Sequence, residues 1–242
     1  MIKSRKLNGD CKIYRCLFME SKMSNNVIDI HMINNKGFIW NANDWYILRT
    51  THRMLGSLIG TLPSTPRQED QNGLPCLLLP EEVRLLVENC IARTVEYPSF
   101  TSLHTKETAK INPFDTSPNV LIHLDEICSN IIEVPLPEFV NNLERIRYKV
   151  FKDLWSKGFY LTCGMKFGGD FLVYKGDPLA YHAKYIVNCR DLDKQMMVSR
   201  SRVSSITNKK MVLAKDDGNS IMYLIYHLDD TSQNNNKINY SF

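Results

Sequence analysis

A tyrosine and a histidine, Tyr174 and His182, lie eight residues apart on either side of a Gly-Asp-Pro turn. A lysine pair, Lys209 and Lys210, follows downstream. RNA carries its own nucleophile, the 2′-hydroxyl, so one group that removes this proton and one that protonates the 5′-oxygen can cut the backbone. Histidine suits the first role because its ordinary pKa lies near neutrality, and a lysine ammonium stabilises negative charge that develops on a phosphate. These residue types indicate RNA cleavage without a metal.

The same residues also fit plain structural roles. A lone histidine is more often a structural or surface residue than a base, and Tyr174 is typical of an ordinary strand. Lys209 and Lys210 fit a solvated pair at the start of a strand. Asp170 and Asp177 are interpreted as turn and cap residues rather than metal ligands. No metal and no cofactor are therefore expected.

Two blocks of the chain carry longer motifs around these candidates. They comprise Gly158-Phe159, Lys166-Phe167-Gly168-Gly169-Asp170-Phe171, Tyr174, Gly176-Asp177-Pro178, His182 and Tyr185-Ile186-Val187 in the second half, and Gly73-Leu74-Pro75 with Leu77-Leu78-Leu79-Pro80-Glu81-Glu82 in the first. The motifs resemble the catalytic subunits of the tRNA-splicing endonuclease, over residues 27–95 and 138–228. Within that family the chain is most similar to the smaller catalytic subunit, which is assigned to the 3′ splice site.

This resemblance implies a role for each candidate residue. His182 matches the general base of the family, Tyr174 its general acid, and Lys209 its phosphate-stabilising lysine. Lys210 is the alternative to Lys209, and since adjacent residues of a strand point to opposite faces, only one of them can reach the phosphate. The implied products are a 2′,3′-cyclic phosphate and a 5′-hydroxyl. Leu228 stands near the place where the family often has a tryptophan.

The resemblance also implies partners and a location. Such endonucleases are heterotetramers of two catalytic and two structural subunits, so the expected partners are one second catalytic subunit, two structural subunits and an intron-containing pre-tRNA. The predicted strand at 221–228 is the candidate edge for strand addition to a structural subunit. The nucleus is the expected location, and the mitochondrial surface is the alternative. No membrane insertion is expected, since no apolar run reaches the length of a membrane span.

Two other functions compete with catalysis. The first is a structural, non-catalytic subunit of the same assembly, which would lack the tyrosine, histidine and lysine. The second is a general RNA-binding module, which would not require a histidine beside a tyrosine. The three catalytic candidates do not distinguish the 3′ splice site from the 5′ splice site, because both would use the same residue types.

Composition sets wider limits on the protein. The 242 residues are 43% hydrophobic, which is enough for a real core, and the net charge of +4 does not by itself indicate nucleic-acid binding. The seven cysteines are scattered without a CxxC pair, which predicts reduced thiols and no zinc site.

The expected fold class is α+β, with a small N-terminal α/β domain followed by a restriction-endonuclease-like catalytic domain of the tRNA-intron endonuclease type. We expect a basic extension over 1–24, the first domain over 25–96, a linker over 97–136, the nuclease domain over 137–230 and a flexible tail over 231–242. Helices are predicted at 43–55, from Pro80 onward and at 138–157. Strands are predicted at 27–32, 37–40, 159–162, 171–174, 181–187, 211–214 and 221–228.

Overall fold

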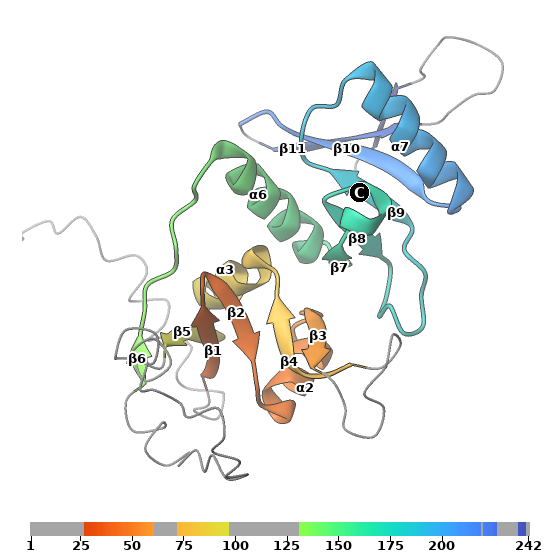
Figure 1. The fold of residues 1–242 in the computed structure, drawn as a ribbon. Helices are drawn as coiled ribbons and strands as arrows, with labels where there is room; N and C mark the ends of the chain where they lie inside the picture. Colours follow the sequence, from red (N-terminus) through yellow and green to blue (C-terminus); the bar gives the residue numbers. More distant parts are fainter. Residues whose placement is uncertain (1–26, 61–71, 97–130, 219, 227–236, 241–242) are drawn as a thin grey trace, which may run out of the picture.

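The computed structural model describes residues 27–60, 72–96, 131–218, 220–226 and 237–240 (Figure 1). These parts of the chain form two mixed sheets with helices packed on them, so the predicted α+β class is confirmed. The extension at 1–24 and most of the linker at 97–136 lie outside the described residues. No helix within the described ranges is long and apolar enough to cross a membrane.

The first sheet is built around a hairpin that joins the two strands predicted at 27–32 and 37–40. Asn34 and Asn35 both have positive φ, 50° and 60°, as a two-residue hairpin turn requires. They join the first two strands of a sheet whose order is β3-β4-β2-β1-β5-β6. Its strands are β1 (Ile28–Ile33), β2 (Lys36–Ile39), β3 (Ser57–Gly60), β4 (Gly73–Leu78), β5 (Ala92–Glu96) and β6 (Ile132–Glu133).

Two helices of the described residues accompany this sheet. Helix α3 (Pro80–Glu88) begins at Pro80 as predicted, since the missing N–H of proline costs least at the first helical position. Helix α2 (Ala42–Thr50) begins earlier than predicted. Its N-cap is Asn41, because the Asn41 side chain accepts a hydrogen bond from the Asn43 N–H at 2.8 Å.

A buried carboxylate ties the segment after α2 to α3. Glu82 is fully buried and accepts hydrogen bonds from the backbone N–H groups of Leu55 at 2.9 Å, Gly56 at 3.1 Å and Leu79 at 2.8 Å. Burial raises the pKa of Glu82, while these three donors oppose the rise. The segment that follows α2 is therefore fixed to the start of α3.

The second sheet has the order β12-β11-β10-β9-β8-β7. Only β9 and β10 pair in parallel among its described strands, and helix α7 makes the crossover that a parallel pair requires. Its elements are α6 (Asn142–Ser156), β7 (Tyr160–Cys163), the 3₁₀ turn η1 (Met165–Phe167), β8 (Phe171–Tyr174), β9 (Tyr185–Asn188), α7 (Lys194–Ile206), β10 (Lys210–Asp216), β11 (Ile221–Tyr226) and β12 (Lys237–Tyr240).

Three features of this half differ from the sequence-based expectation. The predicted strand at 181–187 begins only at Tyr185, so His182 lies in a loop. Helix α7 was not predicted, because its buried positions are Ser201 and Ser204 rather than an apolar stripe. Strand β12 forms within the tail that was expected to be flexible, and it pairs with β11. The 221–228 strand is consequently not the open sheet edge that was expected to receive a partner.

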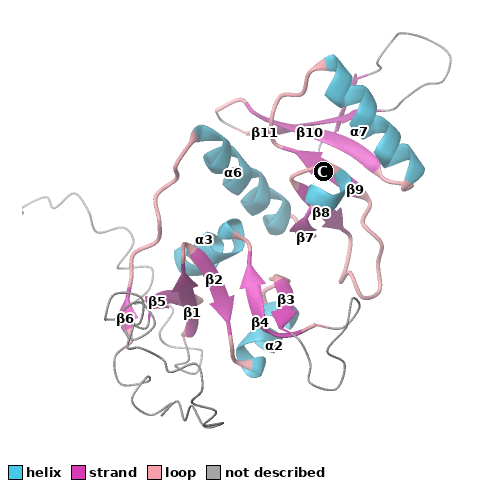
Figure 2. Ribbon diagram, viewed as in Figure 1, coloured by secondary structure: helices cyan, strands magenta, loops and turns pink. Residues whose placement is uncertain are grey.

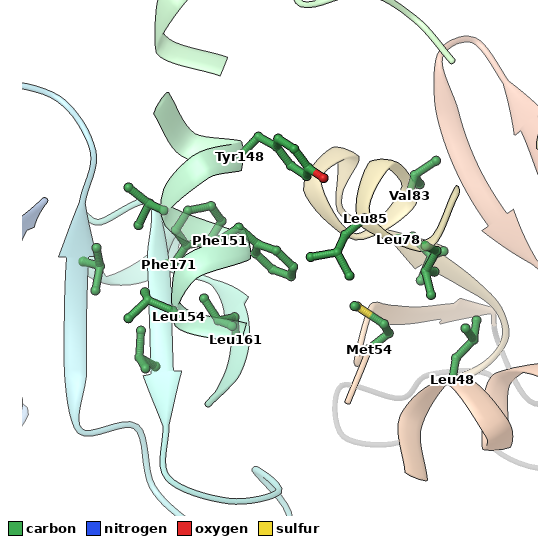
Figure 3. Close-up of a cluster of buried hydrophobic side chains, with 14 of the residues drawn as sticks. Leu48, Met54, Leu78, Val83, Leu85, Tyr148, Phe151, Leu154, Leu161 and Phe171 are labelled. Carbon is green, nitrogen blue, oxygen red and sulfur yellow. The ribbon is translucent and has the colours of Figure 1, made fainter. Parts of the chain in front are cut away.

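One hydrophobic core joins the two halves of the chain. Helices α3 and α6 face each other there, with Leu85 and Phe151 almost completely buried (Figure 3). Phe151 meets Phe171 of β8 edge-on, with ring centroids 5.6 Å apart. Burial of each such side chain contributes about 1.5–3 kcal/mol. The first domain and the nuclease domain therefore share their apolar interior.

Helices α6 and α7 cover opposite faces of the second sheet (Figure 2). Val212 belongs to the core beneath α6, whereas the preceding residue, Met211, contacts Ser201 of α7 through its sulfur at 3.3 Å. Successive residues of a strand point to opposite faces. Strand β10 is accordingly buried on both sides, which explains its continuous apolar sequence.

The expectation of reduced thiols is wrong at Cys90, which is disulfide-bonded. Cys76, Cys163 and Cys189 are free. Burial raises the pKa of the Cys76 thiol to about 12, so this thiol stays protonated at neutral pH.

Candidate functional site

The three candidate residues converge on one edge of the second sheet, by which we mean the edge formed by the ends of β8, β9 and β10 and not an outer strand. Tyr174 is the last residue of β8, His182 lies three residues before β9, and Lys209 immediately precedes β10. These strand ends meet because β8 runs antiparallel to β9 while β9 runs parallel to β10. Backbone hydrogen bonds from Lys184 N–H to the Val173 carbonyl and from the N–H of the first β10 residue to the Lys184 carbonyl, both 2.9 Å, hold the ends together.

A small apolar cluster lies at this edge and links the candidates. Leu172, Ala183 and Ile186 are its buried members, and Phe167 and Tyr174 pack against them. The ammonium of the candidate lysine at 209 lies 4.8 Å from the centroid of the Phe167 ring. The cluster thus contacts the tyrosine directly, reaches the lysine through Phe167, and includes the residue next to the histidine.

Tyr174 is half-buried, and a neighbouring strand supports its hydroxyl. Thr162 of β7 donates a hydrogen bond to the Tyr174 hydroxyl oxygen at 3.4 Å. Since the hydroxyl oxygen accepts this bond, its own proton remains available for donation. The arrangement is compatible with the general acid role that the family resemblance implies.

His182 is exposed, and the path of its loop is set by Asp177. The Asp177 carbonyl accepts hydrogen bonds from the N–H groups of Ala180 at 2.9 Å and Tyr181 at 3.0 Å. Its carboxylate accepts one from the Leu179 N–H at 2.9 Å. Asp177 is a turn residue, as predicted, and the turn it forms leads directly into the candidate base.

The end of α7 orients Lys209. Asn208 adopts a left-handed conformation with φ 52° just past the helix, and its N–H binds the Ser205 carbonyl at 3.1 Å. The Lys209 N–H binds the Ser204 carbonyl at 2.8 Å, which completes a Schellman motif. The Lys209 ammonium also donates to the Thr207 carbonyl at 3.0 Å. This helix C-cap could not be predicted from the sequence, because α7 itself was not predicted.

Lys210 points elsewhere. It is the exposed first residue of β10 and pairs with Tyr185 of β9, whereas Lys209 is half-buried against Phe167.

We therefore expect Lys209→Ala to lower the rate of RNA cleavage by about 100- to 1,000-fold, since this is the usual loss when one charge-stabilising group is removed. Lys210→Ala is the matched control and should cleave at nearly the wild-type rate in single-turnover assays. A larger loss at Lys210 would reverse the assignment.

Asp170 is more than a turn residue. It is 5% exposed, accepts a hydrogen bond from the Cys189 N–H at 2.7 Å, and forms ion pairs with Arg147 at 2.7 Å and Arg190 at 3.4 Å. Arg147 also pairs with Glu81 of α3 at 2.8 Å.

Across the described parts of the chain, no group of three or more His, Cys, Asp or Glu side chains could hold a metal ion.

Comparison with known proteins agrees with this architecture. Residues 28–97 match the TSEN34-like N-terminal domain, and residues 145–223 match the catalytic C-terminal domain of tRNA intron endonucleases. A tRNA-splicing endonuclease of Saccharolobus islandicus is 33% identical over 144 residues, which are 56% of this chain and 74% of that protein. The tRNA-splicing endonuclease subunit Sen34 of Homo sapiens is 24% identical over 76% of this chain and 93% of its own length. The Sen34 subunit of Mus musculus is 44% identical over 28% of this chain and 23% of its own length.

The second domain contains a mixed sheet that brings a tyrosine, a histidine and a lysine to one edge. This domain matches the catalytic domain of tRNA intron endonucleases, so the class of protein is a nuclease of the tRNA-intron type. The chain belongs to the tRNA-splicing endonuclease family and carries its catalytic domain. The predicted family and fold class are therefore confirmed.

Proposed function

We propose that this chain cuts pre-tRNA at the 3′ splice site by acid–base catalysis without a metal. The observation that carries the proposal is the convergence of Tyr174, His182 and Lys209 on one sheet edge, inside a domain that matches the catalytic domain of the family. His182 is exposed to solvent, where an RNA backbone can reach it.

Each residue has a defined part in the proposed reaction. His182 accepts the proton of the 2′-hydroxyl, and the resulting oxygen attacks the adjacent phosphorus. The bond between phosphorus and the 5′-oxygen breaks, and Tyr174 gives its proton to the departing oxygen. Lys209 stabilises the charge on the phosphate while both bonds are partly formed. The products are a 2′,3′-cyclic phosphate on one fragment and a 5′-hydroxyl on the other.

The 3′ assignment rests on the family resemblance of the sequence, and the proposal of partner subunits is supported by the names of the relatives. The human and mouse relatives are named as Sen34 subunits of the tRNA-splicing endonuclease, so we propose that this chain acts within a multi-subunit endonuclease on intron-containing pre-tRNA. A heterotetramer with one second catalytic subunit and two structural subunits, placed in the nucleus, is the arrangement that the family resemblance implies.

The test is a reconstituted complex incubated with an intron-containing pre-tRNA in the presence of EDTA. We expect cleavage at both splice sites, with a 2′,3′-cyclic phosphate at the 3′ end of the intron and a 5′-hydroxyl on the 3′ exon. Loss of cleavage in EDTA with recovery in excess Mg²⁺ would contradict the metal-free chemistry. A complex in which Tyr174→Phe leaves the 3′ cut unchanged would contradict the assigned acid and would favour a non-catalytic subunit.

A further inference from the structure

An ion pair connects the first domain to the loop that carries the candidate base. Arg49, in the last turn of α2, donates from Nη2 to the Asp177 Oδ1 at 2.6 Å. The two side chains are 17% and 33% exposed, so the pair is partly shielded from solvent. It joins residues 128 positions apart in the sequence. The contact is therefore a link between domains rather than a local turn interaction.

The Arg49 end of this link is held in place. Its guanidinium lies 5.8 Å from the centroid of the Trp45 ring on the same helix. The segment after α2 docks on α6, because the Trp155 indole donates to the His52 carbonyl at 2.8 Å and Arg53 stacks over the Trp155 ring at 5.1 Å. Because His52 and Arg53 closely follow α2, a shift of this helix relative to the second domain would disturb their contacts with Trp155.

The Asp177 end sets the path of the loop. The carboxylate oxygen that accepts from Arg49 also accepts from the Leu179 N–H, and the Asp177 carbonyl accepts from the next two N–H groups. The residue after these two is His182. Gly176 adds a steric constraint, since a Cβ at this position would lie 2.5 Å from the ring of Tyr181. A displacement of Asp177 would therefore move the backbone of this turn, and with it the exposed imidazole of His182.

We propose that Arg49 is a positioning residue for catalysis: the first domain holds Asp177 and, through it, places His182 where the 2′-hydroxyl must be deprotonated. This inference rests on the proposed role of His182 as the base. A displacement of about 1 Å at a reacting group can cost about 100-fold in rate. The link therefore makes the first domain necessary for the chemistry of the second.

The test uses the full reconstituted complex with Arg49→Gln, Asp177→Asn, the double variant, and Arg49→Lys. Asp177→Asn removes the charge but keeps an oxygen for the Leu179 N–H. We expect Arg49→Gln and Asp177→Asn each to lower kcat by about 10- to 100-fold with KM within about twofold, because the base moves while the RNA-binding surface stays. The double variant should be no slower than the slower single one. Arg49→Lys, which retains the positive charge, should recover most of the rate.

The matched control is Lys152→Gln. It breaks the ion pair of Lys152 with Glu88, which joins α6 to α3 at 2.9 Å but does not touch the loop. This variant should keep the wild-type kcat, and all variants should keep a wild-type melting temperature within a few degrees. A rise in KM alone, or additive losses in the double variant, would overturn the positioning role.

The same experiment separates this inference from the function on which it rests. If His182→Ala still cleaves at the wild-type rate, the proposed base is wrong and the inference falls with it. If His182→Ala is inactive while Arg49→Gln and Asp177→Asn cleave normally, only the positioning role is overturned.

Discussion

Replacing His182 with alanine is expected to lower the rate of cleavage at the 3′ splice site by about 100- to 10,000-fold, the usual contribution of one acid–base group. The 5′ cut should persist, because the proposed assembly assigns it to a second catalytic subunit. His182 is exposed, so its loss should change the free energy of unfolding by less than about 0.5 kcal/mol. Single-turnover cleavage of a pre-tRNA labelled at its 3′ end measures the effect directly.

His52→Ala is the matched control for this experiment. It removes an imidazole on the segment after α2 but leaves the backbone carbonyl that accepts from Trp155. Burial lowers the pKa of His52, so this side chain is mainly neutral at pH 7 and its loss removes no charge. We expect wild-type cleavage at both sites. Equal 3′ cleavage by His182→Ala and His52→Ala would show that His182 is a structural residue.

The second large effect is expected at Arg147. Its guanidinium bridges the carboxylates of Glu81 and Asp170, which are both 5% exposed. Burial acts to lower the pKa of Arg147, but the two carboxylates outweigh this and leave the pKa raised. Arg147→Met would remove the ion-pair partner of the buried Glu81 carboxylate and leave buried Asp170 with only the longer pair to Arg190 at 3.4 Å, so we expect a loss of about 3–5 kcal/mol in the free energy of unfolding. Urea unfolding of the full chain, followed by circular dichroism, measures this loss.

Lys152→Met is the comparison for Arg147→Met. Lys152 is also on α6 and also pairs with a carboxylate of α3, but its side chain is 53% exposed. Its loss should cost less than about 1 kcal/mol. Adding Glu81→Gln and Asp170→Asn to Arg147→Met should recover part of the lost stability, since the uncompensated charges are removed. Similar losses for Arg147→Met and Lys152→Met would mean that the buried network contributes no more than a surface pair.

Features with a local cause could be predicted from the sequence. The turn at Asn34 and Asn35, the start of α3 at Pro80, and the strand at 171–174 each follow from residues at that place. The glycine at 158, with φ 92°, ends α6 as expected. The family motif also placed the tyrosine and the histidine of the candidate site without knowledge of the fold.

Features that depend on distant contacts could not be predicted. Helix α7 buries serines, so its sequence lacks the apolar period that identifies a helix. Asp170 has the local sequence of a turn residue, and only the arrival of Arg147 from α6 makes it part of a buried ion-pair network. The link between Arg49 and Asp177 joins two domains, and no local pattern records such a contact.

The shared core has a consequence for how the protein unfolds. Helix α6 belongs to the nuclease half, yet Tyr148 and Phe151 on it lie in the same apolar cluster as Leu85 of α3. Separating the halves would expose this interior to water, so neither half gains by opening alone. The two domains that match separate domain families should therefore unfold as a single cooperative unit. We expect one thermal transition whose calorimetric and van't Hoff enthalpies agree.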